Sequence, residues 1–154
     1  MLRVILAALH LLALAIGFRA VLERSAALRL APGDAMLRRA FAADSWWGVA
    51  AILWLGTGLW RWLAGMEKTR EFYRTADWFH LKLGLFTIVF LLELWPMVTL
   101  VRWRIARARR TPAEQVVVPA VAQRIAAIGR LQAVLLVAIL TAAVAVARGY
   151  SLRG

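Results

Sequence analysis

Four long apolar runs alternate with shorter polar segments along the chain, and this alternation is its dominant pattern. Each run approaches the ~17–25 residues that a helix needs to cross a bilayer. In lipid, a helix satisfies its own backbone hydrogen bonds, so long apolar runs of this kind predict membrane-spanning helices. The expected spans are residues 3–22, 45–63, 78–101 and 125–147.

Short connections between these runs predict one membrane domain, residues 1–154, folded as an all-α, four-transmembrane-helix up-down bundle. The first connection, 23–43, contains a turn signal at 31–34 and a candidate short interfacial helix at 36–41. Asp44 is the expected N-cap of the second span. A cleaved signal peptide is the alternative for the first run, because Arg3 precedes it, but the run continues past Gly17.

Composition supports the membrane interpretation. The chain is 63% hydrophobic with a mean hydropathy of +0.71, whereas soluble domains are about 45–50% apolar. There is no cysteine, which excludes disulfides, thiol nucleophiles and cysteine-ligated clusters. Glycine-rich phosphate loops and hydrolase motifs are absent from the sequence.

The net charge of +12 comes mainly from arginines that lie between the apolar runs. This placement indicates membrane-flanking charge and not a nucleic-acid-binding surface. Lysine and arginine are more frequent at the first and third connections than at the other side. The positive-inside rule therefore predicts that these two connections are cytoplasmic and that both termini lie outside.

The two histidines of the chain are the candidate chemistry. His10 lies in the first run and His80 near the start of the third, and parallel spans place both in the outer half of the membrane. At ~1.5 Å per residue they differ in depth by only a few ångströms. One imidazole from each of two facing helices can ligate a haem iron on opposite faces of the ring. The simpler alternative is that both are interfacial polar residues, although an ionisable residue inside a membrane is a functional candidate.

Three further ionisable residues lie in the expected spans. Arg61 and Lys82 are expected near the level of His80, where they could contact two haem propionates. Lys82 is alternatively a lysine that extends to the interface. Glu93 lies near mid-membrane and is expected to be protonated or paired with another helix, since an isolated charge there is costly.

Six short segments carry a resemblance to a known family: 8–10, 43–48, 57–61, 71–73, 79–83 and 101–103. Through them the chain is similar, over roughly residues 1–104, to a family of small bacterial membrane proteins with a domain-of-unknown-function label. His10 and the stretch 78–82, Trp-Phe-His-Leu-Lys, also resemble the HemJ-type protoporphyrinogen oxidases, which are multi-helix membrane proteins.

These resemblances imply a place in the bacterial inner membrane and haem b ligation by His10 and His80. They also make Lys82 the candidate catalytic residue, while Arg61 is a candidate cofactor-binding residue because of its expected level near His80. The leading hypothesis is a haem b-binding redox protein, with a protoporphyrinogen oxidase-like activity and a membrane electron carrier as partner. The alternatives are a non-enzymatic transporter component or respiratory-complex assembly factor, and a copper-binding membrane protein. The glycines of the second span are expected to serve a contact within the chain or in a homodimer.

Overall fold

The computed structural model describes residues 1–64, 77–148 and 150. All regular structure in these residues is helical, which confirms the all-α prediction. The predicted second connection lies almost entirely outside the described residues, as does the 71–73 segment. The helices are α1 (Leu2–Ala27), α2 (Asp34–Leu63), α4 (Asp77–Ala108), α5 (Ala113–Val116) and α6 (Pro119–Arg148).

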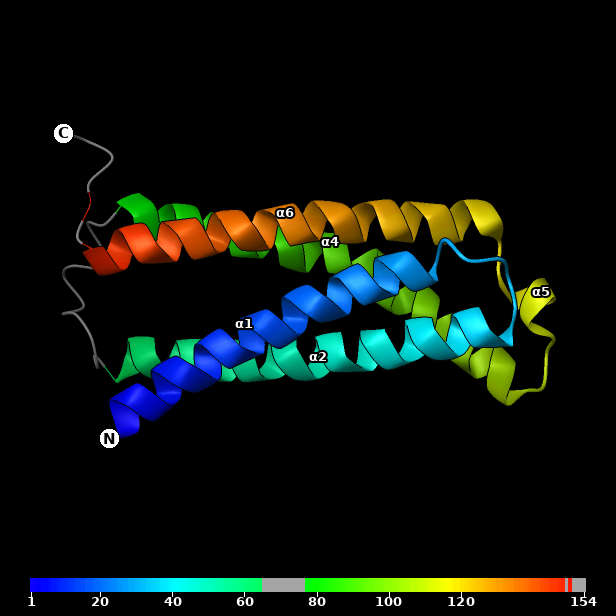
Figure 1. The fold of residues 1–154 in the computed structure, drawn as a ribbon, viewed down its shortest axis with the longest axis horizontal. Helices are drawn as coiled ribbons and strands as arrows, with labels where there is room; N and C mark the ends of the chain where they lie inside the picture. Colours follow the sequence, from blue (N-terminus) through cyan, green and yellow to red (C-terminus); the bar gives the residue numbers. More distant parts are fainter. Residues whose placement is uncertain (65–76, 149, 151–154) are drawn as a thin grey trace.

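The four long helices lie side by side in two pairs (Figure 1). α1 packs along α2, α4 packs along α6, and α1 also contacts α6, whereas α2 and α4 touch only slightly. The start of α1 and the end of α6 lie at one end of the bundle, and α5 lies at the other end beside the α1–α2 connection. This arrangement leaves a long gap between α2 and α4 that side chains only partly fill.

Three described helices, α1, α4 and α6, are long and apolar enough to cross a membrane. α2 has the same length as α6, 30 residues each, and lies beside α1. Its many tryptophans and glycines, together with Arg61, lower its hydropathy below that of the other three. Membrane crossing by residues 45–63, and with it the count of four spans, therefore stays a prediction.

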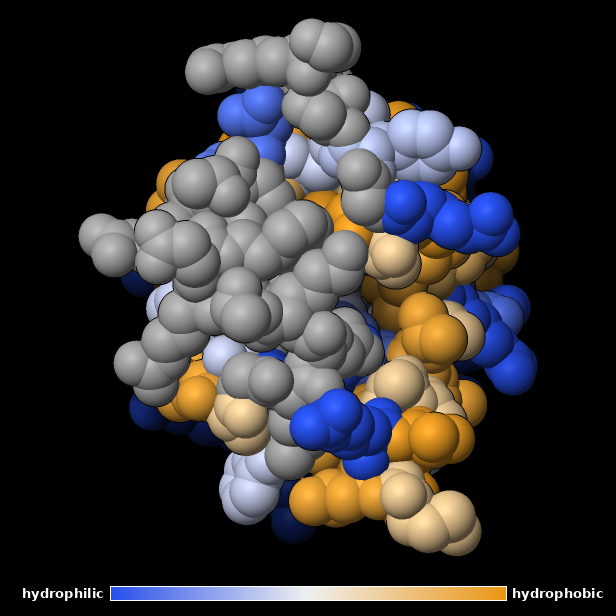
Figure 2. All heavy atoms as spheres, turned by 90° about the vertical axis from the view of Figure 1, so that its left-hand side faces the viewer, coloured by the Kyte–Doolittle hydropathy of each residue, from blue (hydrophilic) through white to orange (hydrophobic). Residues whose placement is uncertain are grey.

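The bundle is packed with small residues inside and covered with large apolar residues outside. Along α6 one face is buried at helical spacing and includes Ala122, Ala126 and Gly129. On the outside, Ile52 is 73% and Val134 is 67% exposed. Small residues let helix backbones approach closely where lipid gives no hydrophobic driving force. Figure 2, which views the bundle from the end where α1 begins and α6 ends, shows hydrophobic residues on its flank between separate groups of hydrophilic residues.

The loop end of the bundle has its own apolar core. A helix of 30 residues is ~45 Å long at ~1.5 Å per residue, longer than a hydrocarbon layer of ~30 Å. The ends of α1, α4 and the starts of α2 and α6 therefore extend beyond it and pack with α5. Leu28, Leu37, Leu100, Trp103 and Ile125 are buried in this core.

The predicted N-cap at Asp44 is wrong, because α2 begins ten residues earlier, at Asp34. Residues 34–44 contain neither proline nor glycine and are mostly good helix formers, so nothing interrupts the helix before the apolar run. The predicted short helix at 36–41 is the first part of α2. Asp44 instead lies inside the helix, where its side chain is available for contacts with neighbouring helices.

Glycines allow close approach at particular crossings only. A Cβ at Gly58 would lie 3.1 Å from His10 Cε1, and one at Gly129 would lie only 2.1 Å from Ser25 Oγ. By contrast, no atom lies within 4 Å of a Cβ built at Gly48 or Gly56. Within the chain, Gly58 therefore serves the α1–α2 contact and Gly129 the α1–α6 contact.

Candidate functional site

His10 is half-buried on α1 and its ring is fixed by α2. His10 Nδ1 lies 2.9 Å from Thr57 Oγ1, and the Thr57 hydroxyl donates to the Leu53 carbonyl at 2.6 Å. The hydroxyl has one proton, which it donates in the hydrogen bond to the Leu53 carbonyl, so Thr57 Oγ1 accepts a hydrogen bond from His10 Nδ1–H. In a neutral imidazole the lone pair then lies on Nε2.

A cavity of about 230 Å³ lies beside this histidine. α1 contributes His10, α2 contributes Trp54 and Gly58, and α4 contributes Phe79 and Lys82. The His10 and Trp54 ring centroids are 5.7 Å apart. Gly58 makes room for the imidazole, because a side chain there would meet Cε1. The cavity is therefore an aromatic pocket with one imidazole and one ammonium group in its wall.

The structure brings His10 and Lys82 into one cavity, but His80 and Arg61 are not among its lining residues. His80 is exposed on α4, and its ring lies 6.1 Å from that of Phe79 in an edge-on arrangement. Arg61 is half-buried at the end of α2. Phe79, Lys82, Leu83 and Phe86 follow helical spacing, and His80 is about 100° away from Phe79 on the same helix. The ligand pair of His10 and His80 thus stays a prediction.

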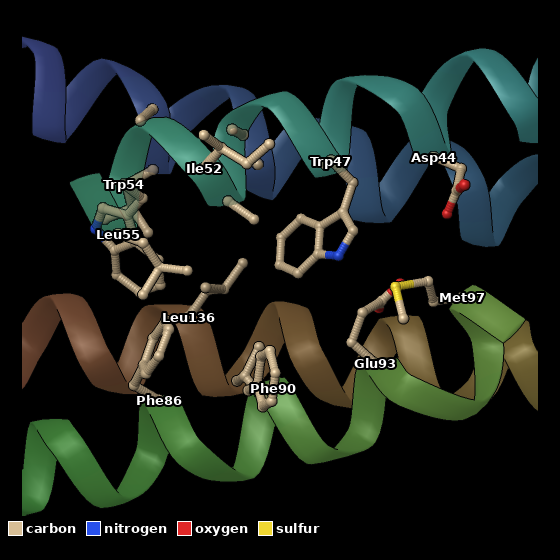
Figure 3. A pocket seen from close by; sticks show the side chains of 17 residues that line it. Asp44, Trp47, Ile52, Trp54, Leu55, Phe86, Phe90, Glu93, Met97 and Leu136 are labelled. Atoms are coloured by element: carbon tan, nitrogen blue, oxygen red, sulfur yellow. The ribbon is translucent and has the colours of Figure 1, made fainter. Parts of the chain in front are cut away.

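A second cavity, of about 350 Å³, continues the first along the gap between α2 and α4. Both cavities are lined by Trp54, Leu55 and Phe86. Figure 3 shows Trp47 of α2 facing Phe90 of α4 across this gap. The lining is almost entirely apolar, except that Asp44 and Glu93 lie at the far end (Figure 3).

Arg24 lies at this far end and is the centre of a buried ionic network. Its side chain is 0% exposed. It donates to both carboxylate oxygens of Glu93, at 2.5 and 2.7 Å, to Asp44 at 3.0 Å and to the Gln132 carbonyl oxygen at 3.1 Å. The Gln132 amide in turn donates to Glu93 at 2.9 Å. Each of the four long helices therefore contributes one member.

The network is closed on its outer side by a second arginine. Arg104 donates to Asp44 at 3.1 Å and to the Phe41 carbonyl at 2.7 Å. Two guanidinium groups and two carboxylates then balance each other. A paired charge costs far less to bury than an isolated one. Glu93 was expected to be either protonated or paired with another helix, and in the structure it pairs with Arg24 of α1.

Arg24, Asp44 and Gln132 were not expected to form a site. Arg24 follows Glu23 at the end of the first run, where an arginine normally marks an interface. The usable signal was Glu93, since an acidic residue in a membrane helix requires a cationic partner at similar depth.

Among the described residues, no three histidine, aspartate or glutamate side chains come together as ligands for a metal ion. A haem iron needs only one or two protein ligands, so this observation concerns sites for a bare ion and not a haem site.

Long apolar helices, a lipid-facing surface of large hydrophobic side chains and a buried ionic network define the class: this is an all-helical integral membrane protein of the lipid bilayer. The chain belongs to the family described as "Predicted membrane protein (DUF2214)", which matches residues 2–151. No curated protein and no solved structure matches the chain significantly.

Proposed function

We propose that this membrane protein binds haem b beside His10 and has a redox role. The observation that carries the proposal is the fixed imidazole: the hydrogen bond from Nδ1 to Thr57 sets the tautomer and orients the ring. Metal-ligating histidines almost always donate their other ring N–H in this way, which raises the basicity of the ligating nitrogen. The atom of His10 proposed to bind iron is therefore Nε2.

The surroundings of His10 fit an apolar macrocycle with acidic substituents. Trp54, Phe79 and Phe86 supply flat aromatic walls, and Lys82 supplies a cation for a propionate. The adjoining space between α2 and α4 extends the pocket to dimensions typical of ligand sites, ~300–1,000 Å³. Arg61, at the end of α2, is proposed as the second propionate partner.

The second axial position fits less well. His80 lies outside the wall of this cavity, so His10 alone fits as a ligand in the arrangement described. Ligation by both histidines requires α4 to turn His80 toward the cavity, and the variants below separate these two forms of the proposal.

A bound haem b would supply one-electron transfer between its ferric and ferrous states. The chain would hold the ring in a dry, aromatic site and neutralise its propionates through Lys82 and Arg61. The gap between α2 and α4 would give a lipid-soluble electron carrier lateral access. A protoporphyrinogen oxidase-like reaction, with Lys82 as the catalytic residue, is the form of this proposal that the resemblance of residues 78–82 supports.

The test is a reduced-minus-oxidised absorption spectrum of the detergent-purified protein, expressed with ample haem supply. We expect a haem b spectrum that His10→Ala abolishes. If His80→Ala also abolishes it, both histidines are ligands; if it leaves the spectrum intact, His10 is the single protein ligand. A spectrum that survives in both variants contradicts the ligand assignment, and a colourless folded wild type contradicts the proposal.

One observation favours a non-enzymatic alternative, a transporter component or assembly factor. The ionic network around Arg24 is buried among the four long helices, apart from His10, and buried charges of this kind occur along ion and substrate pathways. This alternative predicts a colourless bundle in which His10→Ala is tolerated and Glu93→Gln abolishes function in cells. Copper binding would rest on His10 and His80, and copper titration of the purified protein tests it.

A further inference from the structure

A separate cavity of about 500 Å³ opens on the outer face of α1 and α2, toward the loop end of the bundle. It does not share residues with the cavities beside His10 and between α2 and α4. Its floor is made of small residues, and three charged side chains and a tryptophan stand at its edges. The lining residues that matter here are Arg19, Ala20, Glu23, Arg39, Ala43 and Trp46.

The charges of this cavity do not cancel. Glu23 pairs with Arg39 at 3.7 Å, and both side chains are about half exposed. Arg19 makes no hydrogen bond or ion pair with any residue that the structure describes, and it is exposed. Two arginines and one glutamate leave a single positive charge, which matches the single negative charge of a phosphodiester.

The cavity lies at the depth of a lipid headgroup. Arg19 follows the apolar run of α1, and Trp46 precedes the apolar part of α2. Tryptophan is enriched at the membrane–water interface. Because α1 and α2 run antiparallel, Ile16 and Trp46 mark the bilayer side of the cavity and Glu23 and Arg39 its aqueous side.

An apolar surface continues from the bilayer side of the cavity. Leu9 and Leu12 on α1, and Val49 and Leu53 on α2, recur at helical spacing from Ile16 and Trp46. All four are exposed, between 41% and 56%. Acyl chains that start from a phosphate at Arg19 would therefore lie along the outer seam of α1 and α2.

We propose that this cavity binds an anionic phospholipid, with Arg19 and Arg39 on the phosphate and the acyl chains along α1 and α2. Basic pockets between membrane helices bind anionic headgroups in this way. A zwitterionic lipid lacks the net charge that the cavity complements, and free phosphate lacks the chains. The proposal is independent of haem binding, since it uses none of the residues near His10.

The experiment measures binding of phosphatidylglycerol to the full-length, detergent-purified protein by native mass spectrometry, with phosphatidylcholine and inorganic phosphate as comparison ligands. We expect preferential binding of phosphatidylglycerol, weakened about fivefold by Arg19→Gln, since one arginine near the surface contributes ~1 kcal/mol. Arg39→Gln should weaken it at least as much, because this substitution also leaves Glu23 without its cation beside the phosphate. Arg29→Gln, at an exposed arginine outside the cavity, is the control and should bind normally.

Circular dichroism checks that each variant keeps its helical content. Equal binding of phosphatidylcholine would overturn the proposal, as would equal weakening by Arg29→Gln. Inorganic phosphate that competes as well as the lipid would show an anion site without acyl-chain recognition, which also contradicts it. A variant that loses helix content is replaced by Arg19→Lys, which keeps the charge and is expected to retain most of the preference.

Discussion

Arg24 of α1 and Glu93 of α4 meet through two hydrogen bonds, of 2.5 and 2.7 Å, with the arginine completely buried. α1 and α4 belong to different helix pairs of the bundle. The ion pair, with Gln132 beside it, therefore joins the α1–α2 pair to the α4–α6 pair.

Removing one partner of this pair should destabilise the bundle strongly. Arg24→Gln leaves Glu93 as a buried carboxylate without its cation, a loss typically of ~3–5 kcal/mol. Unfolding of the purified protein in mixed detergent micelles with increasing dodecyl sulfate measures this. Glu23→Gln, at the exposed neighbouring acidic residue, is the matched control and should change the midpoint little.

The double variant Arg24→Met, Glu93→Leu should recover most of the lost stability. Asp44 keeps its contact with Arg104, so no unpaired carboxylate is left, and buried ion pairs replaced by apolar residues are often neutral. If the double variant were as unstable as the sum of both single losses, the pairing would not be the cause of the destabilisation.

Gly129→Ala should destabilise the contact between α1 and α6. The added Cβ would lie 2.1 Å from Ser25 Oγ and 3.3 Å from the Val21 carbonyl oxygen. Overpacking of this kind typically costs ~1–3 kcal/mol. The same detergent unfolding assay measures it, and adding Ser25→Ala should restore part of the loss because the hydroxyl is removed.

Gly56→Ala is the control for this substitution. The Cβ there has open space around it, and alanine is the better helix former. Equal destabilisation by Gly56→Ala would contradict the packing argument for Gly129 and would instead indicate that α2 makes a close contact with a second copy.

Thr57→Val should weaken haem binding, whereas Thr57→Ser should preserve it. Valine has nearly the shape of threonine but cannot accept the hydrogen bond from His10. Loss of such a hydrogen-bond partner typically lowers the affinity ~10–100-fold. Haem titration of the apoprotein, followed by absorbance, measures the difference. Equal affinities in the valine and serine variants would show that the 2.9 Å contact does not position the ligand.

The absence of cysteine makes the orientation directly testable. Ala31→Cys places a thiol in the α1–α2 connection, and Tyr150→Cys places one near the opposite end. Because the arginine-rich connections are expected to be cytoplasmic, a membrane-impermeant maleimide should label only Tyr150→Cys in intact spheroplasts. Labelling of Ala31→Cys alone would reverse the orientation.

Much of the helical framework was predictable, because apolar runs of membrane length have few alternatives to a helix. The boundaries were less so: residues 34–44 contain no helix-breaking residue, so α2 continues without interruption from this charged segment into the apolar run. The α1–α6 crossing at Gly129 depends on which helices become neighbours, which hydropathy does not encode.

The site was predictable only in part. His10 is recognisable as a rare ionisable residue in an apolar run, but its partner Thr57 is not, since threonine is common in membrane helices. Glu93 signalled that a cation must lie nearby, yet Arg24 looked like an ordinary interfacial arginine. Phe79 and Lys82 face the cavity from α4, whereas His80 does not. Which face of α4 points to the cavity depends on how the helix is rotated in the bundle, and no local sequence pattern determines this rotation.

The most direct test of haem binding at His10 is the haem content of the purified protein, measured as the pyridine haemochrome after expression with ample haem. The wild type should contain stoichiometric haem b, and His10→Ala, shown to be folded by circular dichroism, should contain none. A folded wild type without haem, or a His10→Ala variant with the wild-type content, would contradict the account.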